Sequence, residues 1–272
     1  MAKHSFGWVP DVPDQRDFLF AAPIESLAAL PSSVDLRPNC PKEVYDQGQL
    51  GSCTANAIAG ALEFEQMKQG LKTFTPSRLF IYYNERAMEG TVGSDSGAQI
   101  RDGVKSVASI GACPETDWAY DLAKFTERPP KVPAFKEAPL GKALQYQRVP
   151  QVLTQMKGCL ASGYPFVFGF TVYESFEGDE VARTGVVPMP SAGEKVLGGH
   201  AVMAVGYEDT SQRFVVRNSW GPDWGLRGYF TIPYAYLTDS NLADDFWTVR
   251  LVAKTAAQLA ADRAAAATSG RP

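Results

Sequence analysis

Residues 47–57, QGQLGSCTANA, place a single cysteine behind a glycine-rich turn and directly before a helical run. Cys53 opens that run, so its sulfur would lie at the positive end of a helix dipole, where a thiolate is stabilised. A small buried hydrophobic residue would suit the same position. The stretch therefore has two interpretations, a structural cysteine or a nucleophile, and its partners elsewhere in the chain must decide between them.

The composition excludes several classes of partner. The chain has 272 residues, 45% of them hydrophobic and 21% charged, which is ordinary for a globular protein. A formal net charge of -4 disfavours nucleic acid and anionic membranes, and no apolar run is long enough to span a bilayer. The first residues lack the apolar core of a signal peptide, which predicts a cytoplasmic protein. Export by a route without a signal stays open.

Metal and disulfide chemistry have little basis in the sequence. No cysteines form a C-x-x-C pair, so we expect no metal site and no cofactor. In a reducing compartment the cysteines are expected to be free thiols, although a Cys40–Cys113 bridge stays conceivable. The complete set of cysteines and histidines is Cys40, Cys53, Cys113, Cys159, His4 and His200.

Helical patterns precede strand patterns along the chain. Apolar spacing, Pro at helix starts and Gly at helix ends predict helices over 54–69, 75–90 and 98–111, and another over 151–162. Short runs rich in Val, Phe and Tyr then predict antiparallel strands at 166–172, 200–207, 213–220, 228–234 and 246–253. A proline-rich stretch, 124–145, reads as a surface connection between the two halves.

This order predicts an α+β fold of two lobes with a ligand site between them. We expect residues 1–31 to be an extended arm and 32–252 to be the folded body. A helical lobe would cover about 32–140 and a β lobe about 141–252, with an Ala-rich tail over 253–272 that is either a loose helix or disordered.

A nucleophilic cysteine needs a partner that accepts its proton, and histidine is the usual one. His4 lies in the arm, where we expect nothing to hold its ring, whereas His200 opens an apolar strand after two glycines. Asn218 ends the following strand, from which its amide oxygen could fix the tautomer of His200. Taken singly, His200 reads as a satisfied polar residue and NSWG as a turn with packing tryptophans.

Together, three blocks of the chain resemble the papain-like cysteine peptidases, and in particular the bacterial branch. The blocks are QGQLGSC, GGHAVMAVGY and RNSWGPDWGLRGYF, in that family's order. His200 follows Cys53 by 147 residues, within the family's window of about 130–150. Leu50 stands where many secreted members have a disulfide cysteine, and Thr54 replaces the usual aromatic residue.

The resemblance implies a helical N-terminal lobe, a β-barrel-like C-terminal lobe, and peptide hydrolysis through an acyl-enzyme. Cys53 would be the nucleophile in a thiolate–imidazolium pair with His200, and Asn218 would orient that imidazole. Gln47 would donate to the oxyanion, its alternative being a plain turn residue. Trp220 and Trp224 would cover the His–Asn hydrogen bond.

The resemblance also points to substrate-binding residues. Ser96 and Gly97 would pair with the substrate backbone, unless that loop only caps a helix through Asp95 or Ser96. Gly199 and Ala201 would line the pocket for the side chain two residues before the cut, with room for a bulky hydrophobic group. The acidic residues of the loop before His200 are expected to form a solvated face, with cation binding as the alternative; they are Glu174, Glu177, Asp179 and Glu180.

The sequence leaves alternatives open for the role of the arm and for the reaction. The arm, residues 1–31, either blocks the cleft or is merely docked or frayed. The partner is expected to be a peptide or protein, and the chain a monomer. Alternatives to hydrolysis are an acyl-transferring or ligase variant of the same site, and a peptide-binding module on an inactive protease fold.

Overall fold

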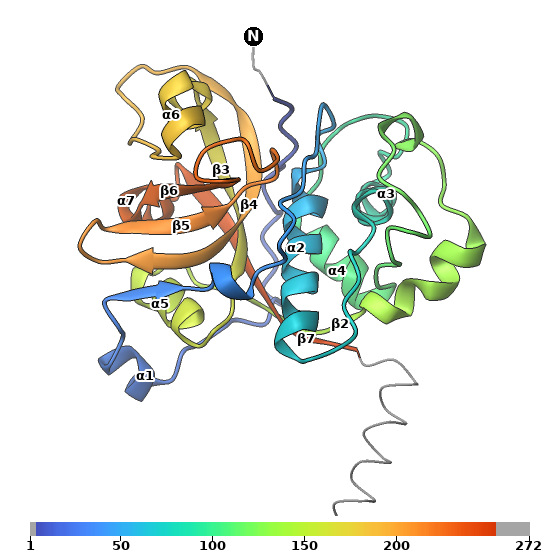
Figure 1. Ribbon diagram of the computed structural model, residues 1–272, viewed down its shortest axis with the longest axis horizontal. Helices are drawn as coiled ribbons and strands as arrows, with labels where there is room; N and C mark the ends of the chain where they lie inside the picture. The colour runs from blue at the N-terminus through green and yellow to red at the C-terminus, as the bar shows by residue number, and fades with distance from the viewer. Residues whose placement is uncertain (1–3, 254–272) are drawn as a thin grey trace, which may run out of the picture.

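The computed structural model describes residues 4–253, and in it a layer of helices packs against one antiparallel sheet (Figure 1). The strands follow the order β2-β7-β3-β4-β5-β6, and β1 also pairs with β4. The path from β2 to β6 is open, so the β lobe is barrel-like only in a loose sense. The strands are β1 (Ser33–Asp35), β2 (Ala143–Arg148), β3 (Phe166–Tyr173), β4 (Val196–Glu208), β5 (Arg213–Arg217), β6 (Tyr229–Pro233) and β7 (Ala243–Val252).

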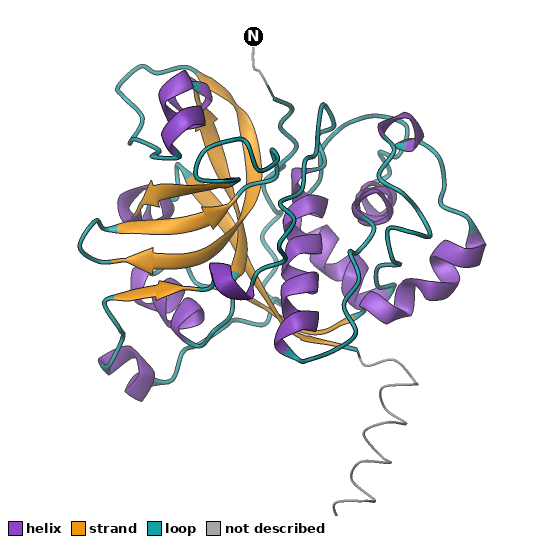
Figure 2. Cartoon of the chain, in the orientation of Figure 1, coloured by secondary structure: helices purple, strands orange, loops and turns teal. Residues whose placement is uncertain are grey.

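The predicted helices of the first half form, and they lie together on one side of the molecule (Figure 2). They are α2 (Cys53–Lys68), α3 (Arg78–Glu89) and α4 (Ile100–Ser109). Helix α3 starts at Ser77, whose side chain accepts a hydrogen bond from the Phe80 N–H, and it ends at Gly90 in the left-handed conformation. Helix α2 is buried on nearly every side because it lies between the other helices and the sheet.

Shorter helices complete the fold. The predicted helix over 151–162 is α5 (Leu153–Ala161), and α6 (Asp179–Thr184) and α7 (Tyr234–Thr238) lie in the β lobe. The two-lobe α+β prediction is therefore confirmed.

The sheet register sets the positions of His200 and Asn218 in the β lobe. His200 lies in β4 opposite Phe170 of β3, and Met203 of the same strand pairs with Arg217. Asn218 follows directly after Arg217, so it comes off the end of β5 beside the part of β4 that carries His200. Adjacent antiparallel strands thus bring together two residues that are 18 positions apart.

Two stretches differ from their expected form. The proline-rich connection ends in strand β2, which pairs with β7, and its Ala134 and Ala138 are buried beside Phe80. Strand β2 buries little of its own surface, so its sequence lacks the alternating apolar residues that indicate a strand. For this reason the sequence did not predict β2. Among its described residues, the arm contains one short helix, α1 (Ile24–Ala28), and a turn at 14–17 that is closed by a hydrogen bond from the Asp17 N–H to the Asp14 carbonyl.

The first part of the arm lies between the two lobes, whereas its later side chains are largely exposed. Its dark blue trace passes between α2 and the sheet before it reaches α1 (Figure 1). Trp8 forms a bridge with Ala98 of the helical lobe, and Leu19 forms one with Arg148 of β2. The arm therefore contacts both lobes. The Ala-rich tail falls, from residue 254 onward, outside the described residues.

Candidate active site

Cys53 is the first residue of α2, and the turn before it is fixed by hydrogen bonds to Asp95. The Gly51 N–H donates to both carboxylate oxygens of Asp95, at 3.1 and 3.0 Å, and the Tyr82 hydroxyl donates to the same carboxylate at 2.5 Å. Asp95 thus holds the glycine turn, not the start of α4, whose N-cap is Gln99. The side chain of Cys53 is fully buried, and the backbone N–H of Ala201 points at its sulfur.

His200 and Asn218 form the hydrogen bond expected from the sequence. His200 Nε2 lies 2.8 Å from Asn218 Oδ1, which also accepts the Ser219 N–H at 2.9 Å. Because that oxygen is an acceptor only, Nε2 carries the proton and Nδ1 is the free basic nitrogen. Nδ1 is buried and has no hydrogen-bond partner among the described residues. Ala201, the next residue, directs its backbone N–H at the Cys53 sulfur, so the segment of β4 that carries His200 meets the start of α2.

Gln47 is fully buried, and a neighbour of Asn218 sets its orientation. The Ser219 hydroxyl donates to Gln47 Oε1 at 2.7 Å, which leaves Nε2 as the donor that points toward the cleft. Nε2 donates to the carbonyls of Leu50 at 2.9 Å and Ser5 at 3.1 Å. Sequence reasoning missed Ser219 as an orienting residue, although it stands inside the NSWG block.

Aromatic rings cover the imidazole. Trp220 stacks on His200 with ring centroids 4.9 Å apart, and Trp224 meets Trp220 edge-on at 5.1 Å. Phe176 packs against both tryptophans. Both tryptophans are buried, and Trp220 is the one that lies directly against the imidazole.

The arm passes directly over the thiol. A backbone hydrogen bond from Gly7 reaches the Cys53 sulfur, and the Gly7 carbonyl accepts the Ala98 N–H at 2.8 Å. The Trp8 N–H donates to the Gly199 carbonyl at 2.9 Å, and the Val9 N–H donates to the Ala98 carbonyl at 3.1 Å. The arm backbone is therefore hydrogen-bonded to both walls of the cleft.

The start of the arm is held as well, which corrects two expectations. His4 stacks on Trp220 at 3.8 Å, and its Nδ1 lies 3.0 Å from Glu177 Oε1, so its ring is not unrestrained. Glu177 is buried and does not belong to a solvated face. Sequence could not reveal this contact, because it joins residues 173 positions apart.

Burial under the arm keeps the thiol and the imidazole neutral. Burial raises the pKa of the Cys53 thiol to about 12, although the backbone hydrogen bonds from Ala201 and Gly7 oppose the rise. Burial also lowers the pKa of His200 to about 4, against the effect of its hydrogen bond to Asn218. The expected thiolate–imidazolium pair is thus not the form that this arm-covered state favours.

The four predicted substrate-binding residues divide into two groups. Gly97, Gly199 and Ala201 lie against the arm or the thiol, and a Cβ on Gly97 would come within 2.2 Å of the Gly7 carbonyl oxygen. The Ser96 hydroxyl instead donates to Thr91 and to the Gly97 carbonyl, away from the arm. On this wall of the cleft, Ala98 makes the backbone hydrogen bonds to the arm.

Within residues 4–253, no group of three or more His, Cys, Asp or Glu side chains could hold a metal ion. All four cysteines are buried and free, so the conceivable Cys40–Cys113 bridge is absent.

Comparisons with known proteins agree on one family. A model described as papain family cysteine protease matches residues 30–247. Xylellain, a cysteine protease from Xylella fastidiosa, is 44% identical, with a TM-score of 0.86 over 93% of this chain and 98% of xylellain. An uncharacterized peptidase C1-like protein of Acanthamoeba polyphaga mimivirus is 42% identical over 91% of this chain and 87% of that protein. A cathepsin B-like protein of Giardia intestinalis is 31% identical over 76% of this chain and 70% of its own length.

Proposed function

Because this chain belongs to the papain family of cysteine proteases, and is a cysteine-type peptidase, we propose that it cleaves peptide bonds through Cys53, His200 and Asn218. His200 Nδ1 would accept the thiol proton, and the resulting thiolate would attack the scissile carbonyl. The imidazolium would then protonate the leaving amine, and water would hydrolyse the acyl-enzyme.

The hydrogen bond between His200 and Asn218 carries this proposal. It fixes the ring through Nε2 and leaves Nδ1 without a hydrogen-bond partner among the described residues, so Nδ1 is free to accept a proton. A neutral amide in this role orients the ring without placing a second charge in a buried site. Trp220 shields the hydrogen bond from water, which strengthens it.

Gln47 and the Cys53 backbone N–H would stabilise the negative charge that develops on the carbonyl oxygen. The Nε2 group of Gln47 already holds a carbonyl of the arm, that of Ser5, at 3.1 Å. A donor of this kind typically contributes about 100- to 1000-fold in rate.

We further propose that the arm, in the described residues 4–31, inhibits the enzyme and is not a substrate of its own site. His200 must deliver its proton to the leaving amine, so the C-terminal half of a substrate lies on the Trp220 side. In the arm, His4 lies on Trp220 while the later residue Val9 pairs with Ala98. The arm thus runs opposite to a productive peptide, which explains how it can occupy the site intact.

A labelling experiment tests the catalytic assignment. A thiol-directed epoxide inhibitor should modify Cys53, as seen by mass spectrometry, and should stop cleavage of a peptide library. Cys53→Ala should abolish both, while Cys159→Ala, which removes another buried free thiol, should keep both. Full cleavage by Cys53→Ala would exclude the proposed nucleophile.

The rival functions have no support in the comparisons. An acyl-transferring or ligase enzyme would yield amide products when an amine is added, whereas a hydrolase yields free acids. A peptide-binding module on an inactive fold would leave Cys53 unlabelled.

Other properties stay predictions from the sequence. The net charge of -4 supports the expectation that nucleic acid is not a partner. Within residues 4–253, no helix has the length and apolar character that crossing a membrane requires. A monomeric state and a cytoplasmic location are untested expectations.

A further inference from the structure

A carboxyl group lies behind the nucleophile and takes no part in the proposed reaction. Glu85 of α3 is fully buried, and its Oε2 accepts the Thr54 hydroxyl at 2.8 Å. Thr54 directly follows Cys53, so the carboxyl is bonded to the first turn of the helix that carries the thiol. The other carboxyl oxygen, Oε1, is buried and has no hydrogen-bond partner among the described residues.

The neighbouring helix α4 leaves room for this carboxyl. A Cβ on Gly103, inside α4, would lie 2.2 Å from Glu85 Oε1 and 2.3 Å from Ile58 Cδ1. Glycine in a helix interior destabilises the helix relative to alanine, so its presence here is explained by the space that it leaves. The packing of α2, α3 and α4 therefore accommodates the Glu85 carboxyl, which an alanine at position 103 would displace.

The charged groups that face Glu85 favour its neutral form. Arg86 follows it in α3, but the guanidinium of Arg86 donates to carbonyl groups of the loop after α3. Burial has the largest effect and raises the pKa of Glu85 to about 8, and Glu89 of α3 and Asp102 of α4 also raise it. Glu85 is therefore neutral in weakly acidic solution and ionises in weakly alkaline solution.

Ionisation of Glu85 opposes ionisation of Cys53. Burial has the largest effect on the pKa of the Cys53 thiol, and the charge of Glu85 raises that pKa further. Two like charges repel strongly here because the protein interior screens them much less than water does. Thr54 and Gly103 belong to the helical lobe and not to the arm, so Glu85 stays buried beside the thiol when the arm leaves.

We propose that Glu85 is a positioning residue for the nucleophile and that its protonation state controls the reactivity of Cys53. As a neutral acid it holds the first turn of α2 through Thr54. As an anion it places a negative charge behind Cys53 and suppresses the thiolate that attacks the substrate. The inference rests on the proposed function, since it concerns the same thiol. It also gives Thr54, which replaces the aromatic residue usual in the family, a role as the donor to Glu85.

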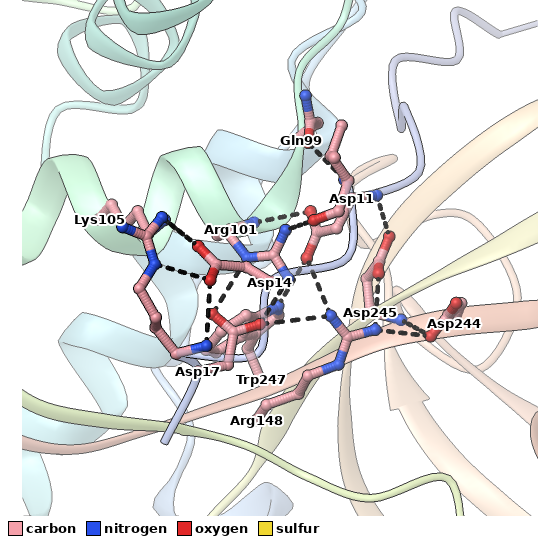
Figure 3. Close-up of polar contacts among 12 residues, drawn as sticks. Asp11, Asp14, Asp17, Gln99, Arg101, Lys105, Arg148, Asp244, Asp245 and Trp247 are labelled. Atoms are coloured by element: carbon pink, nitrogen blue, oxygen red, sulfur yellow. Dashed lines mark hydrogen bonds and ion pairs between the residues drawn. The ribbon is translucent and has the colours of Figure 1, made fainter. Parts of the chain in front are cut away.

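The rate of Cys53 alkylation by iodoacetamide tests this on the full-length chain. Mass spectrometry measures the rate from about pH 5.5 to about pH 9.5 for the unaltered chain, for Glu85→Gln and for a control variant. Docking of the arm should also change with pH, because Arg101 pairs with Asp17 of the arm in a cluster of acids and arginines (Figure 3). All the proteins share that cluster, so its effect cancels when the rate of each variant is divided by that of the unaltered chain at the same pH.

We expect the rate ratio for Glu85→Gln to be constant below about pH 6.5 and to rise about 10-fold through a midpoint near pH 8. The ratio of kcat/KM for peptide hydrolysis should rise in the same way. Glutamine keeps an acceptor for the Thr54 hydroxyl but cannot ionise. A merely structural role of Glu85 would therefore change the ratio equally at every pH.

Glu65→Gln is the matched control. Glu65 is a second buried carboxyl, and burial raises its pKa to about 7, so it ionises over a similar range. It follows Cys53 by twelve residues in α2, which is about 18 Å along the helix. Its charge is too distant to act on the thiol, so the Glu65→Gln ratio should stay flat.

Thr54→Val supplies a second test that does not depend on the folding of Glu85→Gln. The Thr54 hydroxyl stabilises the ionised carboxylate, so without it Glu85 stays neutral to a higher pH. The rate ratio for Thr54→Val should therefore also rise near pH 8.

The outcomes separate the role of Glu85 from the proposed function. A flat ratio for Glu85→Gln, or an equal rise for Glu65→Gln, overturns the role of Glu85. If Glu85→Gln does not fold, a flat ratio for Thr54→Val overturns it instead. Failure of iodoacetamide to modify Cys53 in any of these proteins, including the unaltered chain, would overturn the proposed function itself.

Discussion

Replacement of Gly7 by alanine should release the arm from the active site. A Cβ on Gly7 would lie 1.7 Å from the carbonyl oxygen of Gly51, well inside van der Waals contact. Gly51 cannot easily move, because Asp95 holds its N–H and Cys53 follows two residues later. The strain therefore falls on the arm, whose own backbone must shift away from the thiol.

The size of the effect follows from the cost of overpacking. Forcing a methyl group into a close-packed contact typically costs about 1–3 kcal/mol. This is about 5- to 150-fold in the equilibrium between the docked and released arm. Both the alkylation of Cys53 and the cleavage of a small peptide require the released state, so both rates should rise by the same factor until release is complete.

The assay compares three full-length proteins. Iodoacetamide labelling of Cys53 and peptide hydrolysis are measured at neutral pH for the unaltered chain, Gly7→Ala and Gly93→Ala. The last is the matched control, because a Cβ on Gly93 meets nothing within 4 Å. Unchanged rates in Gly7→Ala, or an equal rise in Gly93→Ala, would refute the view that the arm controls access to the thiol.

Three other changes should have measurable effects. Gln47→Ala should lower kcat for peptide cleavage about 100- to 1000-fold while iodoacetamide still labels the thiol; equal losses in both would point to misfolding instead. Burial raises the pKa of Glu85, which accepts from the Thr54 hydroxyl, to about 8, so the folded state binds this proton more tightly than the unfolded state. The melting temperature should therefore fall as pH rises from about 4.5 to 8, by up to about 3–5 °C per pH unit, and Glu85→Gln should flatten this slope. Burial, together with the nearby carboxylate of Asp11, raises the pKa of Asp245 to about 7, so docking of the arm should weaken as pH rises toward 7. Hydrogen exchange of the arm amides, corrected for the intrinsic rate, should then quicken over that range, and an unchanged exchange rate would contradict this linkage.

The environment of Cys53 illustrates what a linear pattern can reveal. Helix α2 starts at Cys53 as the glycine-rich turn predicts, because helix starts, helix ends and apolar spacing are local properties. His200 and Asn218 could be paired in advance because they lie on consecutive strands, and antiparallel neighbours meet at a predictable edge. The basic imidazole of His200 and the acceptor amide of Asn218 follow directly from the residue types in the sequence.

Other contacts had no local signal. Ser219 orients Gln47 across 172 positions, and the same side chain reads as a turn residue in isolation. The pKa values of Cys53 and His200 depend on burial beneath the arm, which no composition or spacing reports. A helix dipole favours a thiolate at Cys53, but exclusion of water by the arm outweighs it.

The sequence by itself determined the order of helices and strands, the reactive residue types and the family resemblance, because each depends on residues close together or on short motifs. Tertiary structure alone decided that the arm lies over the thiol, that Glu177 holds His4, and that Asp245 accepts the Trp8 indole N–H. Those contacts join residues far apart in the chain, and their energies depend on burial and on neighbours that exist only once the lobes have closed around the arm.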